Sequence, residues 1–446
     1  MPLTSIEDEL YRRKTPASCR FFTTAREYLP GGDSRSTLFY CPYPAVMDRG
    51  DGCLLHDIDG NPLLDFTGNH TSLIHGYSHP HVMKAVQHQL RKGTTFPGAT
   101  EPQLRFARLL CERIPSVERI RFTSSGTEAV LNAIRAARAF TGRSRIAKVE
   151  GGYHGTVDDV MVSIQPSGID AGDRRRPKAT PHGRGVRPEV ASSTVILPFN
   201  DVEGARQVLE SVGDQLAAVL VEPVLGSAGM IPAERAYLEE LRELTEKFGS
   251  VLIFDEVVSF RVAYGGAQAH YGVLPDLTCL GKLIGGGFPL GAFGGRANIM
   301  ALFDPTQGPA IPHPGSHNAN PVALAAGAAC LEILTDAVVA QLNCRSETLR
   351  SDIRTAFGEA SIPVQVTGLG SLFALHLTAS PVRCFRDTLS TDAALRHQIF
   401  LGLYNEGILI DPRGVGCVTT ALGDQEIARF GEALRVVLRR AGNRLE

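Results

Sequence analysis

The stretch Val251-Leu252-Ile253-Phe254-Asp255-Glu256-Val257 decides the fold of this 446-residue chain. Four apolar residues that end in a carboxylate are typical of a strand buried on both faces, as in the parallel sheets of α/β proteins. Open parallel sheets bind their ligands at the carboxyl ends of the strands. Asp255 is therefore predicted to face a bound ligand.

Apolar strands and amphipathic helices alternate on the N-terminal side of this stretch. Helices are predicted over 201–212 and 235–248, with the apolar run Leu216-Ala217-Ala218-Val219-Leu220-Val221 between them. This βαβ pattern predicts an α/β fold with an open, mainly parallel sheet and helices on both faces. Glu222 ends its apolar run as Asp255 does, so both carboxylates are expected at the same edge of the sheet. The alternative role for Glu222 is to anchor a neighbouring loop.

A lysine in apolar surroundings follows the deciding stretch. Lys282 lies between Leu280 and Leu283 and just before three consecutive glycines, which is an unusual place for a solvated amine. Such a lysine has a lowered pKa and can attack carbonyl groups. An acid for a pyridinium nitrogen and a lysine for an aldehyde are the two protein groups that a pyridoxal phosphate (PLP) site most needs. Asp255 and Lys282 together predict such a site.

A strand, a glycine turn and a helix start form a candidate anion site upstream. The strand Arg119-Ile120-Arg121-Phe122-Thr123 precedes Ser124-Ser125-Gly126-Thr127-Glu128, in which Ser125 and Glu128 have the spacing of a capping box. Free N–H groups at the start of such a helix, with the Ser125 and Thr127 hydroxyls, would hold a phosphate. A plain helix cap is the competing interpretation.

Three further segments have unusual composition. Glycines on both sides of Tyr153, in Gly151-Gly152-Tyr153-His154-Gly155, would let its ring lie flat against a cofactor, although a ring packed in a loop is the commoner case. The polar, arginine-rich segment 167–193 is predicted to be a mobile solvated loop, with a lid over the site and a nucleic-acid patch as the second and third interpretations. The segment 285–296 is so rich in glycine that its backbone is predicted to pass close to a bulky group.

The overall composition excludes several functional classes. Forty-five Lys and Arg against 47 Asp and Glu give a net charge of −2, which offers no field to attract nucleic acid or an anionic membrane. Nine cysteines without a Cys-x-x-Cys pair argue against a disulfide framework or a zinc site. The histidines lack acidic or histidine partners at ligand spacing, so no metal is predicted. The first thirty residues contain no apolar core segment and no run reaches membrane length, which predicts a cytoplasmic location.

Both ends of the chain are predicted to build a smaller lobe. The alternating pattern over 53–66, with Asp59-Gly60 at its turn, predicts a hairpin. Other predicted elements are helices over 80–91 and 101–113, a long alanine-rich helix from about 322, strands near 364–366 and 372–377, and helices near 391–406 and 424–440. The predicted division is residues 1–65 for the N-terminal segment of the small lobe, 66–325 for a large cofactor-binding domain and 326–446 for a C-terminal small domain.

The motifs, taken together, resemble the class III aminotransferases of PLP fold type I. They cover nearly the whole chain and are Ser125-Gly126-Thr127-Glu128-Ala129, Gly152-Tyr153-His154-Gly155, Val221-Glu222-Pro223, Asp255-Glu256-Val257, Leu280-Gly281-Lys282-Leu283-Ile284-Gly285-Gly286-Gly287 and Gly315-Ser316-His317-Asn318-Ala319-Asn320-Pro321. The resemblance implies a large domain with a mainly parallel, seven-stranded sheet and a smaller α+β lobe built from both termini.

The resemblance also implies roles for the matching residues. Lys282 would bind the cofactor covalently and move protons, Asp255 would pair with the pyridine nitrogen and Tyr153 would stack on the ring. The remaining cofactor-binding positions would be Ser125, Gly126 and Thr127 in the phosphate cup, with His154, Glu222 and Val257 beside them. Ser316 matches a threonine that usually reaches the phosphate of the neighbouring subunit, which implies an obligate homodimer with shared active sites.

Two subgroups of the family compete for the substrate. The chain is similar to glutamate-1-semialdehyde aminomutase around 261–268, but its link from Asp255-Glu256-Val257 to Phe260-Arg261 is one residue shorter. Residues 34–42 and Asp411-Pro412-Arg413-Gly414 instead resemble the β-amino-acid (β-phenylalanine type) aminotransferases, in which arginines matching Arg35 and Arg413 receive carboxylates. Judged on its own surroundings, Arg35 would be a surface arginine stacked on a tyrosine. A planar guanidinium suits bidentate carboxylate binding.

The predicted function is that of a PLP-dependent aminotransferase with a ping-pong mechanism. It would move an amino group from an amino acid, with a β-amino acid as the expected donor, to a keto acid such as 2-oxoglutarate or pyruvate. The alternative is glutamate-1-semialdehyde 2,1-aminomutase or a related PLP isomerase or racemase, which needs no separate keto acid. A non-catalytic ligand-sensing protein on the same fold would be expected to lose Lys282 or Asp255, and both are present.

Overall fold

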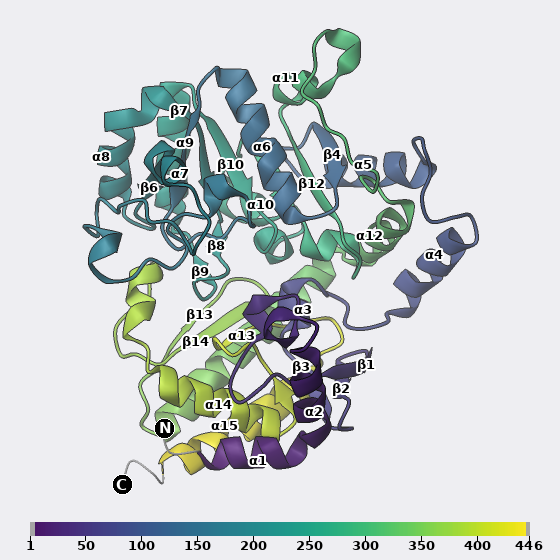
Figure 1. The fold of residues 1–446 in the computed structure, drawn as a ribbon, viewed down its shortest axis with the longest axis vertical. Helices are drawn as coiled ribbons and strands as arrows, with labels where there is room; N and C mark the ends of the chain where they lie inside the picture. Colours follow the sequence, from purple (N-terminus) through teal and green to yellow (C-terminus); the bar gives the residue numbers. More distant parts are fainter. Residues whose placement is uncertain (1–4, 443–446) are drawn as a thin grey trace.

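A seven-stranded sheet runs through the upper part of the molecule (Figure 1) in the computed structural model, which describes residues 5–442. Its strand order is β4-β12-β11-β10-β7-β5-β6. The strands are β4 (Arg119–Thr123), β5 (Arg145–Val149), β6 (Thr194–Leu197), β7 (Leu216–Val221), β10 (Val251–Asp255), β11 (Leu277–Leu280) and β12 (Gly291–Gly295). The strand predicted from Val251 onward is the central one, and all of its residues are buried.

The strands that carry the two candidate carboxylates run side by side in the same direction. β10 pairs in parallel with β7 and β11, and β5 pairs in parallel with β6 and β7, whereas β12 is antiparallel to both of its neighbours. The mainly parallel sheet is therefore confirmed. Because β7 and β10 end at the same edge, Glu222 and Asp255 meet there, as predicted.

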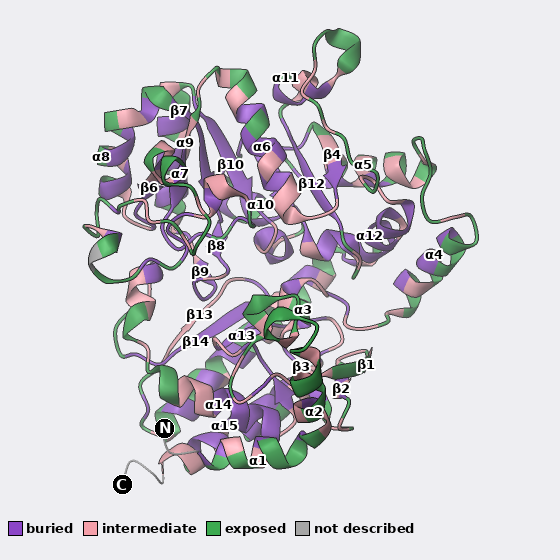
Figure 2. Ribbon diagram, viewed as in Figure 1, coloured by how far each residue is buried: buried purple, intermediate pink, exposed green. Residues whose placement is uncertain are grey.

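Helices cover both faces of this sheet. In β10, Val251 and Ile253 pack in one apolar cluster with α6 (Gly126–Thr141), while Leu252 and Phe254 pack in another with α9 (Arg235–Phe248). This alternation follows from the period of two along a strand. Figure 2 shows the buried sides of these helices turned toward the sheet. Helix α8 (Val202–Val212) packs beside α9, and α7 (Pro188–Ser193) lies next to β6.

Glycine dominates β12 because neighbouring backbones lie very close to it. A Cβ added at Gly291 would lie 2.1 Å from the carbonyl oxygen of Ser125, and one at Gly286 would lie 2.5 Å from that of Ala326. The bulky neighbour predicted for the segment 285–296 is therefore protein backbone. The sequence did not predict β12 itself, since glycine is uncommon inside strands.

Both ends of the chain build the lower part of the molecule (Figure 1). The C-terminal strand β15 (Ile408–Leu409) pairs in parallel with the N-terminal strand β3 (Pro62–Asp65). The other small-sheet strands are β1 (Met47–Asp51), β2 (Leu54–Asp57), β13 (Gln365–Thr367), β14 (Leu372–His376) and β16 (Val415–Cys417), and the two-stranded sheet is β8 (Val224–Leu225) with β9 (Ile231–Pro232). The α+β lobe from both termini and the hairpin over 53–66 are thus confirmed.

The remaining helices include those predicted over 80–91, 101–113, 391–406 and 424–440, and several short ones that were not predicted. They are α1 (Ile6–Lys14), α2 (Pro16–Ala25), α3 (Gly68–Thr71), α4 (Pro80–Leu90), α5 (Glu101–Arg113), α10 (Ala267–Tyr271), α11 (Ala297–Met300), α12 (Pro321–Ile333), α13 (Asp336–Glu359), α14 (Ala393–Asn405) and α15 (Asp424–Gly442). The long helix predicted from about 322 is two helices, α12 and α13, bent by 77°. The break occurs at Thr335, whose hydroxyl accepts a hydrogen bond from the N–H of Val338 and starts α13.

Within residues 5–442, no single helix is long and apolar enough to cross a membrane, and the bent pair of α12 and α13 passes such a test by length and composition only. The domain boundaries predicted after residues 65 and 325 stay a prediction. The outer ends of those ranges, residues 1–4 and 443–446, lie outside the described part of the chain.

A buried arginine fastens segments that are distant in sequence. Arg261, just beyond β10, is fully buried. Its guanidinium donates to the hydroxyl of Ser371 (2.7 Å) and to the carbonyl oxygens of Thr71 (3.2 Å) and Val418 (2.6 Å). Since the acceptors come from both ends of the chain, this one side chain ties the central sheet to the lower part.

We predict that Gly291→Ala lowers the thermal unfolding temperature, because its Cβ would overlap the Ser125 carbonyl oxygen and push β12 away from the start of α6. Overpacking of this kind typically costs roughly 1–3 kcal/mol. The matched control is Gly358→Ala in α13, where nothing lies within 4 Å of the added Cβ and alanine favours the helix. Calorimetry should show a lower transition for the first variant and an equal or higher one for the second; equal transitions in both would contradict the close approach at β12.

Candidate active site

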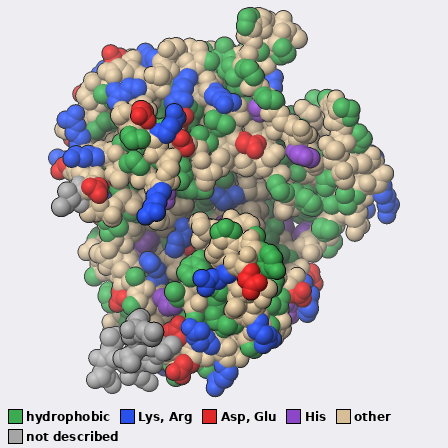
Figure 3. Space-filling model, in the orientation of Figure 1, with side chains coloured by type: hydrophobic (Ala, Val, Ile, Leu, Met, Phe, Trp, Pro, Cys, Tyr) green, Lys and Arg blue, Asp and Glu red, His purple; other side chains and the backbone are tan. Residues whose placement is uncertain are grey.

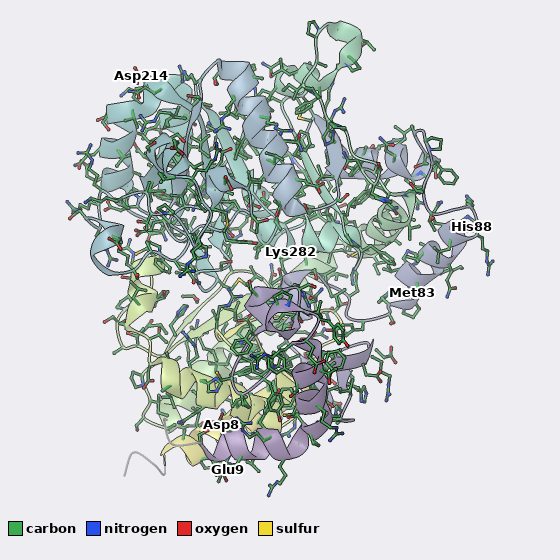
Figure 4. The ribbon with its side chains drawn as sticks, in the orientation of Figure 1. Asp8, Glu9, Met83, His88, Asp214 and Lys282 are labelled. Atoms are coloured by element: carbon green, nitrogen blue, oxygen red, sulfur yellow. The ribbon has the colours of Figure 1, made fainter. Side chains whose placement is uncertain are left out.

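A cavity of about 410 Å³ lies at the sheet edge where β7 and β10 end. Figure 4 places Lys282 between the upper and lower parts, and Figure 3 shows that this face is hollowed there. The predicted site residues that line the cavity are Gly126, Thr127, Tyr153, His154, Glu222, Asp255, Val257, Lys282 and Arg413. Three others, Ser125, Ser316 and Arg35, lie outside it. Tertiary structure thus gathers most of the predicted site from segments far apart in sequence.

Lys282 follows β11 in a left-handed backbone conformation. Its φ of +47° is one that L-residues adopt only at some cost, about 1–2 kcal/mol. Burial lowers the pKa of its amine, the nearby Asp255 and Glu222 charges oppose that shift, and the Arg413 charge adds to it. The conformation directs the amine at the cavity, and its lowered pKa favours attack on a carbonyl carbon.

Asp255 is fixed by two hydrogen bonds at the end of β10. Its Oδ2 lies 2.9 Å from Nδ1 of His154, and its Oδ1 accepts the N–H of Val257 (3.1 Å). Burial lowers the pKa of His154, so its ring is neutral and Nδ1 carries the proton toward the carboxylate. The other ring nitrogen, Nε2, is buried and has no hydrogen-bond partner among residues 5–442. His154 therefore orients Asp255 without neutralising its charge.

Glu222 holds the loop that carries Tyr153. Its two carboxylate oxygens accept the N–H groups of Tyr153 (2.8 Å) and Gly226 (3.2 Å). Burial and the charge of Asp255 raise the pKa of Glu222. Loop anchoring, the alternative considered for Glu222, is what its contacts support, while its carboxyl group still lines the cavity.

A second buried lysine supports the same loop and was not predicted. Lys148 in β5 is fully buried and donates to the carbonyl oxygens of Gly152 (2.9 Å) and Val162 (2.7 Å). Burial lowers its pKa to about 7. The available signal was one cation inside an otherwise apolar strand.

The start of α6 forms one wall of the cavity. The hydroxyl oxygen of Ser125 accepts the N–H of Glu128 (3.3 Å), which makes it the helix cap, and Gly126 and Thr127 line the cavity. A Cβ at Gly155 would lie 2.3 Å from the Thr127 hydroxyl oxygen, so glycine is required for this close packing. The first-turn N–H groups of a 16-residue helix are thereby presented at the cavity.

Arg413 reaches the cavity from the lower part of the molecule. Its Nε and Nη2 donate to the two carboxylate oxygens of Asp411, at 2.8 and 3.0 Å, and Nδ1 of His70 lies 3.3 Å from Oδ2 of Asp411. Burial would raise the pKa of Asp411, but the bonds from His70 and Arg413 outweigh it and hold that pKa well below its usual range. His70 and Asp411 carried no sequence signal that linked them, because they are brought together only by folding.

Arg35 lies at a second cavity next to the first. This cavity, of about 510 Å³, is mostly apolar and shares Thr37, Thr67, His70 and Asp411 with the first. The exposed guanidinium of Arg35 donates to the side-chain oxygen of Asn69 (3.0 Å). Arg35 therefore lines one cavity and Arg413 the other, and the two cavities adjoin at the residues that they share.

The arginine-rich segment borders the site and is fastened at one end. His182 lines the first cavity. Arg386 donates to both oxygens of Glu150 (2.7 and 2.8 Å) and to the carbonyl oxygen of Gly172 (2.8 Å). A lid formed by 167–193 stays a prediction. Ser316 is exposed in the loop before α12. Across residues 5–442, no group of three or more His, Cys, Asp and Glu side chains could hold a metal ion.

Comparisons with known proteins agree with this geometry. The family model described as aminotransferase class-III matches residues 40–427. A β-phenylalanine transaminase of Variovorax paradoxus is 40% identical over 96% of this chain and 94% of its own length. A glutamate-1-semialdehyde 2,1-aminomutase of Methanothermobacter thermautotrophicus is 39% identical over 94% of this chain and 97% of its own. The crystal structure of an omega-transaminase from Sphaerobacter thermophilus has a TM-score of 0.94 and 46% identity, covering 97% of this chain and 99% of that one.

Class III aminotransferases depend on PLP, and the cavity fits that cofactor. The glycine-lined start of α6 offers N–H groups to a phosphate, the buried carboxylate of Asp255 suits a protonated ring nitrogen, and the amine of Lys282 suits the aldehyde. One feature of the structure supports the fit: among residues 5–442, the carboxylate of Asp255 is bonded only to the neutral His154 ring and the backbone N–H of Val257, so its charge is left for a protonated ring nitrogen.

We predict that PLP uptake by the apoprotein stays fast down to a lower pH than an ordinary lysine would allow. Only the neutral amine binds the aldehyde, and the neutral fraction falls as the pH drops through the pKa of Lys282, which burial lowers. Stopped-flow absorbance between about pH 6 and pH 10 measures the rate, and Lys282→Ala should show no covalent uptake. A rate that falls as soon as the pH drops below about 10 would contradict the lowered pKa.

Proposed function

We propose that this chain, which belongs to the class III aminotransferases, takes its amino group from a β-amino acid and passes it to a keto acid such as 2-oxoglutarate or pyruvate. The main observation in support is that the guanidinium of Arg413 lines the same cavity as the amine of Lys282. A substrate held at its carboxylate by Arg413 would present its amine-bearing carbon toward Lys282. The similarity to a β-phenylalanine transaminase supports a carboxylate one carbon farther from the amine than in an α-amino acid.

The proposed roles of the cavity residues follow from their contacts. Bound PLP would supply an electron sink for the carbon that loses its proton. Asp255, kept charged and oriented by His154, would hold a proton on the ring nitrogen. Gly126 and Thr127, next to the Ser125 cap, would hold the phosphate, and Val257 packs against Gly126 beside them. Tyr153, held by Glu222, would lie against the ring.

Lys282 is the proposed proton carrier. Once an incoming amine takes its place, its Nζ would accept the proton from the amine-bearing carbon of the donor and return one at the former aldehyde carbon. A lowered pKa suits this role, because a base works best when its pKa lies near the working pH. The keto acid would then react by the same proton transfers in reverse, which is the ping-pong order.

Aminomutase activity is the second candidate, since a glutamate-1-semialdehyde 2,1-aminomutase is nearly as similar in sequence. The short link from Val257 to Arg261 speaks against it. Arg261 is fully buried, and its guanidinium donates hydrogen bonds to Thr71, Ser371 and Val418. This region therefore serves packing. Product analysis without an added keto acid separates the two candidates, because only the isomerase converts its substrate alone.

We also propose a homodimer with shared active sites. Ser316 is exposed and does not line the cavity of its own chain. If Ser316 bound the cofactor phosphate of a partner subunit, this would explain why the motif that contains Ser316 occurs together with the other cofactor motifs. Mass measurement in solution tests the dimer. The cytoplasmic location stays a prediction.

We predict that a β-amino acid such as β-phenylalanine bleaches the absorbance of the lysine-bound cofactor, and that added 2-oxoglutarate or pyruvate restores it. The panel should include α-, β- and ω-amino acids at equal concentration, with single-turnover rates as the readout. The β-amino acids should react fastest because Arg413 fixes the carboxylate. A cofactor spectrum that no amine donor changes would overturn the proposed function, and a clear preference for α-amino acids would overturn its substrate class.

We predict that Arg413→Ala raises KM for a carboxylate-bearing donor far more than it lowers kcat. A hydrogen-bonded charge pair contributes about 1.5–3 kcal/mol, which corresponds to roughly a tenfold to hundredfold change. Arg413→Lys should recover part of the loss, because an ammonium keeps the charge but not the planar fork. Steady-state kinetics with a donor that lacks a carboxylate is the internal control; an equal loss with that donor would show that Arg413 supports the fold rather than the substrate.

A further inference from the structure

One short turn beside the site has a backbone conformation that is unusual for its residues. The turn α3, which lies between the upper and lower parts in Figure 1, has φ values of +51° at Gly68, +47° at Asn69, +52° at His70 and +71° at Thr71. Only the first of these is glycine. Left-handed conformations cost L-residues about 1–2 kcal/mol each, and such strain persists only where the surroundings hold it.

Several hydrogen bonds hold this turn in place. The Thr67 hydroxyl oxygen accepts the N–H of Asn69 (3.2 Å), and the Thr67 carbonyl oxygen accepts the N–H of Thr71 (2.9 Å). The buried guanidinium of Arg261 donates to the carbonyl oxygen of Thr71 (3.2 Å). The turn is therefore connected through Arg261 to the segment that follows β10.

Two consecutive side chains of the turn are linked to the two candidate carboxylate-binding arginines, Asn69 directly to Arg35 and His70 to Arg413 through Asp411. The side-chain oxygen of Asn69 accepts from Arg35 at 3.0 Å. Nδ1 of His70 lies 3.3 Å from Oδ2 of Asp411, which binds Arg413 through both of its oxygens. The turn also separates the two cavities, since His70 lines both of them.

We propose that Asn69 and His70 are positioning residues, and that this strained turn sets the distance between the two guanidinium groups that receive substrate carboxylates. This inference rests on the proposed function. The ligand class is an amino or keto acid whose carboxylate lies at a defined distance from its reacting carbon. Successive left-handed residues point their side chains to different sides, so a single rigid turn serves both arginines.

His70 matters because Asp411 competes with the substrate for Arg413. The guanidinium carries five N–H donors, and Asp411 uses two of them, that of Nε and one of Nη2. The edge formed by Nη1 and Nη2 therefore remains to donate hydrogen bonds to a substrate carboxylate. The bond from His70 holds Asp411 on the far side of Arg413. Without it, Asp411 would keep its bonds to Arg413, from the backbone N–H (2.9 Å) and the guanidinium, and the two side chains could shift together toward the substrate.

The test compares His70→Ala and His70→Asn in the holoenzyme, with β-phenylalanine as the carboxylate donor and 1-phenylethylamine as the donor without one. We expect the kcat/KM ratio of the first donor to the second to fall about tenfold in His70→Ala, mainly through KM, as for the loss of one bond to a charged group. His70→Asn should recover part of the ratio, because its amide can still donate to Asp411. The matched control is His88→Ala, an exposed histidine on α4 at the edge of the molecule (Figure 4), which should leave the ratio unchanged.

A binding measurement separates positioning from a general effect on the fold. Succinate carries carboxylates but no amino or keto group, and calorimetry gives its Kd for each holoenzyme variant. We expect weaker succinate binding in His70→Ala and no further loss when His70→Ala is added to Arg413→Ala, as a double-mutant cycle requires of residues that act through one another. Asn69→Ala should behave in the same way toward Arg35→Ala.

The outcomes distinguish this inference from the proposed function. If the wild-type enzyme neither transaminates any carboxylate-bearing amine nor binds succinate, the proposed function and this inference fall together. If Arg413→Ala weakens carboxylate binding but His70→Ala does not, or if the two losses add, the inference alone is wrong. Should His70→Ala not fold, His70→Leu replaces it, because leucine fills similar space but offers Asp411 no donor and leaves the pair of Asp411 with Arg413 intact; an unchanged donor ratio in that variant would also overturn the inference.

Discussion

The arrangement of this molecule depends on one electrostatic constraint: the amine of Lys282 and the carboxylates of Asp255 and Glu222 share one cavity, in which the carboxylates are buried. Removing such groups from water is costly unless they are paired or hydrogen-bonded. The two carboxylates stabilise the charged lysine, and burial works against it. Each carboxylate is also held by N–H donors from neighbouring loops. The loops around the cavity are therefore placed by the need to satisfy charges that the parallel strands bring to one edge.

The two parts of the molecule supply different groups to the site, and this follows from the same constraint. The central sheet supplies the groups that would serve the cofactor, because only parallel neighbours such as β7 and β10 present several strand ends at one edge. The chain termini supply Arg35 and Arg413, which would select the substrate. Arg261 and the left-handed turn connect the two sets through hydrogen bonds rather than through apolar packing alone. Such a connection fixes distances, which matter more for a carboxylate than for an apolar group.

Sequence reasoning succeeded where the physical signal is local. The apolar run before Asp255, the isolated Lys282 and the cap of α6 each stand within a few neighbouring residues, and the structure gathers Asp255, Lys282 and the start of α6 at one cavity. It failed at β12, whose glycines are explained only by the approach of backbones from other strands, and at the bend between α12 and α13. It also missed Lys148, since the carbonyl groups that this lysine binds lie in a separate loop.

The sequence by itself determined the fold class, the family and the chemistry, because strand periodicity, helix caps and a lysine in apolar surroundings depend on adjacent residues. Only the tertiary structure decided that Glu222 anchors the Tyr153 loop and that Arg35 and Arg413 lie at two adjoining cavities. It alone revealed His70 and Asp411 as neighbours. These facts concern contacts between segments that are far apart in the sequence, and such contacts leave no pattern in any one stretch of the chain.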